Sequence, residues 1–120
     1  MKVLIVDDSP VMRKIVTRGL RQAGFTGHTI EEAGNGKEGL EKVQSFEPDL
    51  ILSDWNMPEM SGIEFLETLR EQGCRIPFCF VTSEASEEMR SRAISSGAEG
   101  LVTKPFTPDA LQTQLGKFLG

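Results

Sequence analysis

Aspartates, a threonine and a lysine stand at the ends of short apolar segments of the sequence, and these residue types suit phosphate chemistry. They are Asp7, Asp8, Asp54, Thr82 and Lys104. Each has an ordinary explanation when taken alone, because acids after a strand often cap a helix, Thr is common in turns and Lys is usually a solvated surface charge. A functional site is indicated only if the fold brings them together.

Carboxylates brought close together repel one another until a proton or a cation relieves the repulsion. Ligands that are all oxygen favour Mg²⁺, which takes one or two carboxylates together with phosphate oxygens. Asp54 is the best candidate for a nucleophile, because a carboxylate can accept a phosphoryl group once the charges are neutralised. In this hypothesis Asp7 and Asp8 hold the metal, while Lys104 and Thr82 offer a charge and a hydrogen bond to phosphoryl oxygens.

The segments that must position these residues alternate between strands and helices. Apolar runs bounded by Asp, Ser, Gly or Pro predict strands over residues 2–6, 28–33, 50–52, 77–81 and 100–103. Amphipathic stretches predict helices after them, from Pro10 to Gly24, over 36–46, from Ser61, over 86–96 and from Thr107. This alternation predicts a doubly wound α/β fold, with parallel strands joined by right-handed crossovers and helices on both faces of the sheet.

In a doubly wound sheet the site lies beyond the carboxyl ends of the strands. The loops after the first, third, fourth and fifth predicted strands carry all of the polar residues named above. The predicted fold therefore brings the two N-terminal aspartates, Asp54, Thr82 and Lys104 to one edge of the sheet.

Helical periodicity also predicts which side chains face the core. In the first helix Val11 and Ile15 are expected on the apolar face, away from the basic side chains. The fourth helix offers only Met89, Ala93 and Ile94 as apolar anchors. So thin a stripe indicates a loosely held, mobile helix.

Four motifs in this order and spacing resemble the receiver domain of bacterial response regulators: Asp7-Asp8, residues 53–58 with Gly62, residues 81–83, and Lys104-Pro105-Phe106. The resemblance covers the whole chain, residues 1–120, and is strongest to stand-alone, CheY-like members that act in chemotaxis. It implies a flavodoxin-like (βα)5 fold with a five-stranded parallel sheet in the order 2-1-3-4-5.

The resemblance also implies site roles. A histidine kinase or a histidine phosphotransfer domain would phosphorylate Asp54, with Mg²⁺ as the cofactor. Asp8 and Asp54 would ligate the metal directly, Asp7 would act largely through water, and Asn56 would contribute its backbone carbonyl.

Further positions are expected to tune the response. Thr82 would move toward the phosphoryl group, Lys104 would pair with it, and the bond from Lys104 to Pro105 would be cis. Asn56 and Glu84 match polar positions that influence hydrolysis of the acyl phosphate in the family. Glu84 fits equally well as an acid that favours the start of the following helix.

Some positions allow two interpretations. Leu101 stands where chemotaxis members usually carry an aromatic residue, which puts an aromatic switch and a flagellar motor target in doubt; it is either a smaller apolar gate or, as we favour, an ordinary strand residue. Trp55 is either a surface residue at the rim of the site or an anchor for a partner. The stretch 12–30 contains no acid, so its basic residues form either a solvated helix face or a docking patch for an acidic kinase or phosphotransfer domain: Arg13, Lys14, Arg18 and Arg21.

Charge and composition exclude several classes of protein. The 120 residues include 13 Lys and Arg against 18 Asp and Glu, and the net charge of −5 argues against nucleic-acid or anionic-membrane partners. Apolar runs are far shorter than the ~18 residues of a membrane span, so we expect a cytoplasmic protein. Cys74 and Cys79 fit neither a redox motif nor a zinc site and are expected to be reduced.

The favoured hypothesis is a stand-alone response regulator, not an enzyme, that changes its protein-binding surface when Asp54 is phosphorylated. Its target would be a flagellar motor component or another signalling protein, or the chain would serve as a phosphate sink or phosphorelay shuttle. The main alternative is an Mg²⁺-dependent phosphohydrolase with an Asp nucleophile, although such enzymes usually carry Asp-x-Asp after the first strand. An inactive receiver-like scaffold and a flavin or nucleotide binder fit less well, because the acceptor residues are intact and no Gly-rich loop follows the first strand.

Overall fold

The strands form one parallel sheet in the order β2-β1-β3-β4-β5. They are β1 (Lys2–Val6), β2 (Thr29–Ala33), β3 (Leu50–Ser53), β4 (Phe78–Thr82) and β5 (Gly100–Thr103). The computed structural model describes residues 1–119, and the side chains of residues 1–117. The doubly wound fold and the expected strand order are both confirmed.

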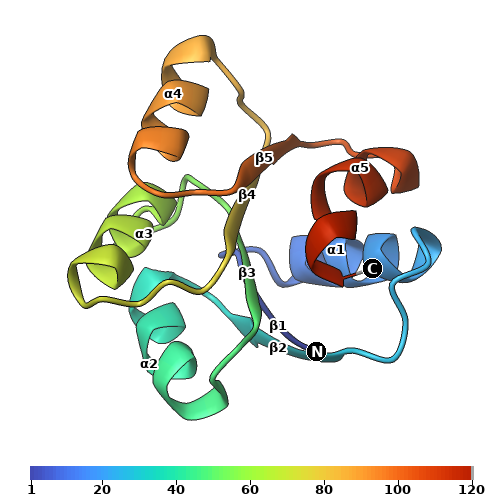
Figure 1. The fold of residues 1–120 in the computed structure, drawn as a ribbon, viewed down its shortest axis with the longest axis horizontal. Coiled ribbons are helices and arrows are strands. Elements are labelled where there is room, and N and C mark those ends of the chain that lie inside the picture. Colours follow the sequence, from blue (N-terminus) through green and yellow to red (C-terminus); the bar gives the residue numbers. More distant parts are fainter. Residues whose placement is uncertain (120) are drawn as a thin grey trace.

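The helices cover the two faces of this sheet (Figure 1). They are α1 (Pro10–Gln22), α2 (Gly36–Phe46), α3 (Gly62–Glu71), α4 (Glu87–Ser95) and α5 (Pro108–Leu119). Figure 1 shows α1 and α5 on one face and α2, α3 and α4 on the other. Every connection thus returns the chain to the same end of the sheet, so the loops after the strands gather at one edge.

Helix starts follow the capping signals of the sequence. The Ser9 side chain accepts a hydrogen bond from the N–H of Met12, and Pro10 occupies the first helical position of α1. At the start of α3, Ser61 and Glu64 form a capping box. Such local hydrogen bonds satisfy N–H groups that have no partner inside the helix.

The predicted strand over 77–81 lies one residue too early, because the structure places β4 at Phe78–Thr82. Thr82 still pairs with Thr103 of β5, and its carbonyl accepts a hydrogen bond from the N–H of Lys104 at 2.7 Å. The second strand likewise begins at Thr29 and not at His28. Pairing between strands, which a single segment does not reveal, sets these ends.

Each face of the sheet buries its own core. On the side of α3, the rings of Phe65 and Phe80 flank Phe78 with centroids 5.5 and 5.0 Å away in edge-to-face contacts. On the other side, Leu20 of α1 and Leu111 of α5 are buried in one cluster. Packing on both faces holds the strands in place, and with them the carboxyl ends that carry the polar residues.

Three apolar side chains that the periodicity directs inward are exposed in the structure. Val11 and Ile15 of α1 are 66% and 41% exposed, and Ile94 of α4 is 61% exposed. Ile15 and Ile94 each lie one residue from a buried position, Val11 lies beside the partly buried Met12, and one residue turns the helix surface by about 100°. The apolar face of each helix is therefore wider than the part that is buried. In α4, Ala93 is the only fully buried residue.

Among the described residues, Cys74 and Cys79 are free, as expected for reduced cysteines. Burial raises the pKa of the Cys79 thiol to about 12. No helix in the described part of the chain has the length and hydropathy required to cross a membrane.

Candidate functional site

The carboxyl ends of the strands deliver the predicted polar residues to one place. Asp7 follows β1 and Asp54 follows β3, while Thr82 ends β4 and Lys104 follows β5. The backbone holds these positions, because the N–H of Asp54 donates to the carbonyl of Val6 at 2.9 Å across the adjacent strands. The convergence expected from the fold is present.

One carboxylate oxygen each from Asp7, Asp8 and Asp54 lies within 4.8 Å of the others. Asp7 is buried, Asp54 is partly buried and Asp8 is exposed. Hard carboxylate oxygens are the ligands that Mg²⁺ prefers, and an exposed side leaves room for water and phosphate oxygens. This acidic cluster therefore has the right chemistry to hold the divalent cation expected from the sequence.

The Lys104 ammonium is the cation that the structure places in the cluster. Its Nζ lies 2.9 Å from Asp7 Oδ2 and 3.4 Å from Asp54 Oδ2, and the side chain is only 13% exposed. The peptide bond from Lys104 to Pro105 is cis, as the family resemblance implied. One ammonium thus contacts two of the three carboxylates.

The environment of Asp54 raises the pKa of its carboxyl group. Burial is the main cause, the neighbouring Asp7 carboxylate adds to it, and the Lys104 ammonium opposes it. The N–H of Trp55 also donates to Asp54 Oδ1 at 2.7 Å, which favours the charged form. The balance means that additional positive charge would favour the ionised, nucleophilic form of Asp54.

Asp7 is held from both its side chain and its backbone. The N–H of Ser9 donates to Asp7 Oδ1 at 2.9 Å. Arg13 donates from Nη1 to the Asp7 carbonyl oxygen and from Nε to Glu32 Oε1 at 2.8 Å. The sequence placed Arg13 only among surface cations; its supporting role depends on how α1 folds back over β1, which no local pattern reveals.

Gly62 lets helix α3 begin directly against the backbone of Asp54. A Cβ atom at Gly62 would lie 2.0 Å from the Asp54 carbonyl oxygen and 2.9 Å from the Phe80 ring. The Gly62 N–H donates to the Trp55 carbonyl at 2.7 Å, and the Ser53 hydroxyl donates to the Asp54 carbonyl at 2.9 Å. A residue without a side chain is required at this close approach.

Thr82 is buried at the end of β4, and its Oγ1 accepts a hydrogen bond from the N–H of Glu84 at 3.4 Å. The side chains of Glu84 and Asn56 are exposed. Within residues 1–117, no hydrogen bond or ion pair joins either side chain to Asp7, Asp8 or Asp54. Their influence on phosphoryl lifetime therefore stays a prediction.

Leu101 is 5% exposed and belongs to the core between the sheet and α3 and α4, which favours its interpretation as an ordinary strand residue. Trp55 is 9% exposed and packs against Phe80 with ring centroids 4.7 Å apart. The prediction that Trp55 is a surface residue or partner anchor is wrong. The Trp55 ring packs against a residue of the neighbouring strand β4, which is distant in sequence, so local sequence did not indicate its burial.

A doubly wound sheet with clustered carboxylates, a threonine and a lysine at its carboxyl edge defines a receiver domain. A family model described as the response regulator receiver domain matches residues 3–116. The chain belongs to the response regulator receiver domain family.

Similar proteins are of the CheY type. The chain is 39% identical to the chemotaxis protein CheY-3 of Vibrio cholerae, over 98% of this chain and 90% of that protein. It is 40% identical to the chemotaxis protein CheY of Pseudomonas aeruginosa, over 98% and 94% of the two chains. Among solved structures, Vibrio cholerae CheY4 superposes with a TM-score of 0.85 at 39% identity and covers 98% of each chain. The receiver domain of Francisella response regulator 1452 has a TM-score of 0.82 at 30% identity, over 98% and 95%.

Proposed function

We propose that this chain is a CheY-type phosphoacceptor of a two-component system, with Asp54 as the residue that is phosphorylated. The observation that carries the proposal is the acidic cluster around the Lys104 ammonium. A donor phosphohistidine on a kinase or phosphotransfer domain would present its phosphorus to a carboxylate oxygen of Asp54. An O–P bond forms, the N–P bond breaks, and the imidazole nitrogen leaves with the electron pair. The chain is thus a phosphoacceptor and not an enzyme with its own substrate.

The residues of the site have distinct roles in this proposal. Asp7, Asp8 and Asp54, with the backbone carbonyl of Asn56, would hold Mg²⁺, which supplies positive charge against the carboxylates and the phosphoryl oxygens. The Lys104 ammonium lies close enough to Asp54 to pair with a phosphoryl oxygen bonded to it. Thr82 offers its hydroxyl from the end of the adjacent strand.

The donor protein would dock beside the acceptor on the exposed apolar side of α1. A hollow of about 400 Å³ there is lined by Met12, Ile15, Ser83, Lys104, Pro105 and Phe106. Because Lys104 belongs to both the hollow and the acidic cluster, a partner seated there has Asp54 within reach. The exposed cations Lys14 and Arg18 flank this side of α1, so the donor surface should be apolar with an acidic rim.

The output surface would be formed by α4, β5 and α5. Thr82 ends the strand that leads into α4, and Ala93 is the only fully buried residue of that helix. A shift of Thr82 toward a phosphoryl group would therefore meet little resistance from α4. The chemotaxis names of the relatives favour signalling in motility. Leu101 stands where an aromatic switch residue would be expected, which argues against a target that depends on such a switch. Use as a phosphate sink or shuttle needs the same site and differs only in partner.

Acetyl phosphate with Mg²⁺ tests the proposal directly. We expect intact mass to show one added phosphoryl group that requires Mg²⁺ and decays with time. Trp55 fluorescence should change in parallel, because the backbone N–H of Trp55 donates to Asp54 and its indole ring is buried against Phe80.

Asp54→Asn should abolish both signals, and Asp49→Asn is the matched control at the other end of β3. Asp49 is exposed, and its hydrogen bonds within the described part of the chain are with Lys2 of β1. Phosphorylation of the Asp54→Asn protein, or rapid turnover of simple phosphate esters by the unaltered protein, would overturn the assignment; the second result would favour a phosphohydrolase.

A further inference from the structure

We propose that Arg13, oriented by Glu32, is a positioning residue of the acidic cluster and determines where Asp8 lies. This inference deepens the proposed function and rests on it, because it takes the acidic cluster as a site for Mg²⁺. It is carried by a chain of contacts that runs from the edge strand β2 through α1 to the peptide unit between Asp7 and Asp8. The expected consequence is that Arg13 sets the affinity for Mg²⁺ without contacting the metal.

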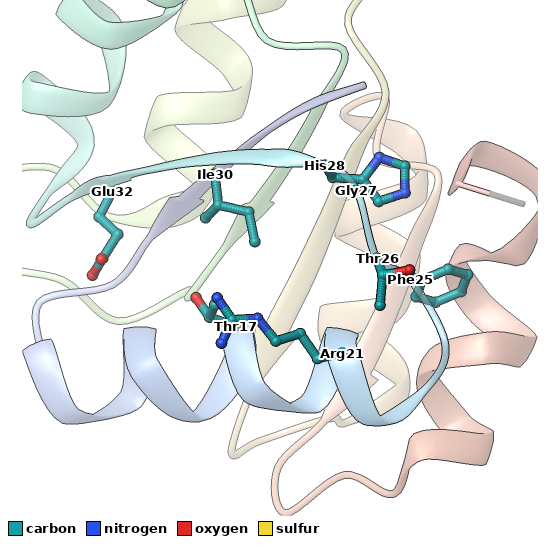
Figure 2. Close-up of a pocket in the computed structure, with 8 residues that line it drawn as sticks. All are labelled: Thr17, Arg21, Phe25, Thr26, Gly27, His28, Ile30 and Glu32. Carbon is teal, nitrogen blue, oxygen red and sulfur yellow. The ribbon is translucent and has the colours of Figure 1, made fainter.

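Glu32 reaches α1 from the edge strand β2. Figure 2 shows that the side chains of Glu32 and Ile30 both point from β2 toward α1, as alternate residues of a strand do. Glu32 Oε1 accepts a hydrogen bond from Arg13 Nε at 2.8 Å, and the Arg13 side chain is only 17% exposed. A partner from another element thus holds the sheltered guanidinium.

The same guanidinium donates from Nη1 to the carbonyl oxygen of Asp7. Because a guanidinium is a rigid planar fork, the bond that holds Nε also sets the direction of Nη1. The carbonyl of Asp7 and the N–H of Asp8 belong to one planar peptide unit. Fixing that carbonyl therefore fixes the backbone from which the Asp8 carboxylate projects.

The Asp7 and Asp8 side chains differ in how much they need this support. Asp7 Oδ1 accepts from the N–H of Ser9, and Asp7 Oδ2 accepts from Lys104 Nζ, both at 2.9 Å. Within residues 1–117, no hydrogen bond or ion pair holds the exposed Asp8 carboxylate. The position of Asp8 in the cluster thus depends on its backbone, and residues that orient metal ligands typically change metal affinity by about 10–100-fold.

Charge alone predicts the opposite effect. The Arg13 guanidinium is a cation bonded to the backbone of the cluster, so it repels a divalent cation. If only this charge mattered, Arg13→Gln would bind Mg²⁺ more tightly than the unaltered protein. Positioning predicts weaker binding, so the sign of the change separates the two explanations.

Titration calorimetry with Mg²⁺ measures this sign. We expect Arg13→Gln to bind Mg²⁺ about tenfold more weakly. Arg13→Lys should lose at least as much, because an ammonium keeps the charge but lacks the planar fork. Arg21→Gln is the control for net charge, since it removes the same charge from an exposed position about two turns later on α1. It should change the Mg²⁺ affinity by less than about twofold, because salt screens a distant surface charge.

Glu32→Ala and Glu31→Ala form a second matched pair, with side chains that are 43% and 39% exposed. Glu31 is the next residue on β2, and it pairs with Lys42 Nζ of α2 at 2.6 Å on the opposite face of the sheet. Both variants lose one carboxylate and one ion pair. Glu32→Ala should weaken Mg²⁺ binding, by less than Arg13→Gln does, whereas Glu31→Ala should leave it unchanged.

NMR relaxation in EDTA gives a readout that needs no metal. The N–H of Asp8 lies in the peptide unit that Arg13 holds, so its order parameter should fall from about 0.85 toward 0.6 in Arg13→Gln and stay high in Arg21→Gln. A rigid Asp8 amide in Arg13→Gln, Mg²⁺ binding that is unchanged or tighter, or equal losses in Arg13→Gln and Arg21→Gln would refute this inference alone. Absence of Mg²⁺ binding by the unaltered protein would refute the metal site of the proposed function as well.

Discussion

Asp8→Asn should stabilise the protein when Mg²⁺ is absent, although it removes a residue of the functional site. Asp8 contributes one of three carboxylate oxygens that lie within 4.8 Å of one another, and of these three residues the Lys104 ammonium is paired with Asp7 and Asp54. Among the side chains of residues 1–117, no cation is paired with Asp8, so Asp8 repels two neighbours. The substitution keeps the shape of the side chain and removes its charge.

The size of the effect follows from Coulomb's law. At 4.8 Å, the upper limit of these separations, two unit charges repel by about 0.9 kcal/mol in water and by about 3.5 kcal/mol at an effective dielectric constant of 20. Asp8 is exposed, so the value in water applies, and salt reduces the sum over two neighbours to about 1 kcal/mol. For 120 residues the entropy of unfolding is about 250 cal/mol/K, so Tm should rise by about 4 °C.

Thermal unfolding in EDTA and in Mg²⁺ tests both halves of this reasoning. At a Mg²⁺ concentration ten times the dissociation constant, the unaltered protein should gain about 1.4 kcal/mol, or about 6 °C in Tm. Asp8→Asn should gain much less, because one ligand is weakened. The two Tm values should therefore change order when Mg²⁺ is added.

Glu41→Gln is the matched control, since it makes the same change in net charge from an exposed position in α2. It should leave the Tm in EDTA within about 1 °C and keep the full response to Mg²⁺. The reasoning is refuted if Asp8→Asn lowers the Tm in EDTA, or if Mg²⁺ stabilises this variant as much as it stabilises the unaltered protein. Either result would mean that the carboxylates do not both repel one another and bind Mg²⁺.

Further predictions concern the backbone, the acceptor and the thiols. Gly62→Ala should destabilise the fold by about 3 kcal/mol or more in urea unfolding, because its Cβ would lie 2.0 Å from the Asp54 carbonyl oxygen; a cost under about 1 kcal/mol would contradict this contact. The raised pKa of Asp54 means that the folded protein holds this proton more tightly than the unfolded chain, so stability should fall as pH rises above about 4 and up through the raised pKa. Asp54→Asn should remove that part of the pH dependence in EDTA. If the stability of the variant and of the unaltered protein changes with pH in the same way, Asp54 does not make this contribution. With a thiol reagent at pH 8, one label per folded chain is expected on Cys74, because the pKa of the buried Cys79 thiol is about 12; a second label at the same rate would refute the burial of Cys79.

The sequence predicts the fold well wherever the signal is local. Ser9 with Pro10 and Ser61 with Glu64 are hydrogen-bonding or conformational devices within a few residues of each other, and the structure confirms both helix starts. The order of apolar runs and helices then determines that the strand ends converge. That is why Asp54 could be placed at the site from the sequence alone.

The sequence fails where a side chain depends on distant partners. Trp55 stands beside a polar loop, but Phe80 on the adjacent strand offers an apolar surface 4.7 Å away between ring centroids. Arg13 has the same composition signal as its exposed neighbours, yet it donates to the Asp7 carbonyl. Val11 shows the opposite error, since an apolar residue on the expected face remains 66% exposed. Periodicity predicts which face of a helix is apolar, and packing determines how much of that face is buried.

The arrangement of charge explains why the residues of the proposed acceptor site should oppose folding. Three ionised carboxylates and one ammonium leave the cluster with two uncompensated negative charges, which equals the charge of one divalent cation. The phosphoryl group of the proposed function would add further negative charge, so we expect the site to accept it only with a cation besides Lys104. Burial of Asp54 should make this dependence stronger, because it raises the pKa of this carboxyl group and penalises its ionised form. Substitutions that relieve the repulsion should therefore stabilise the fold and weaken the proposed phosphorylation of Asp54. Such a trade-off is expected where residues serve a function at a cost in stability.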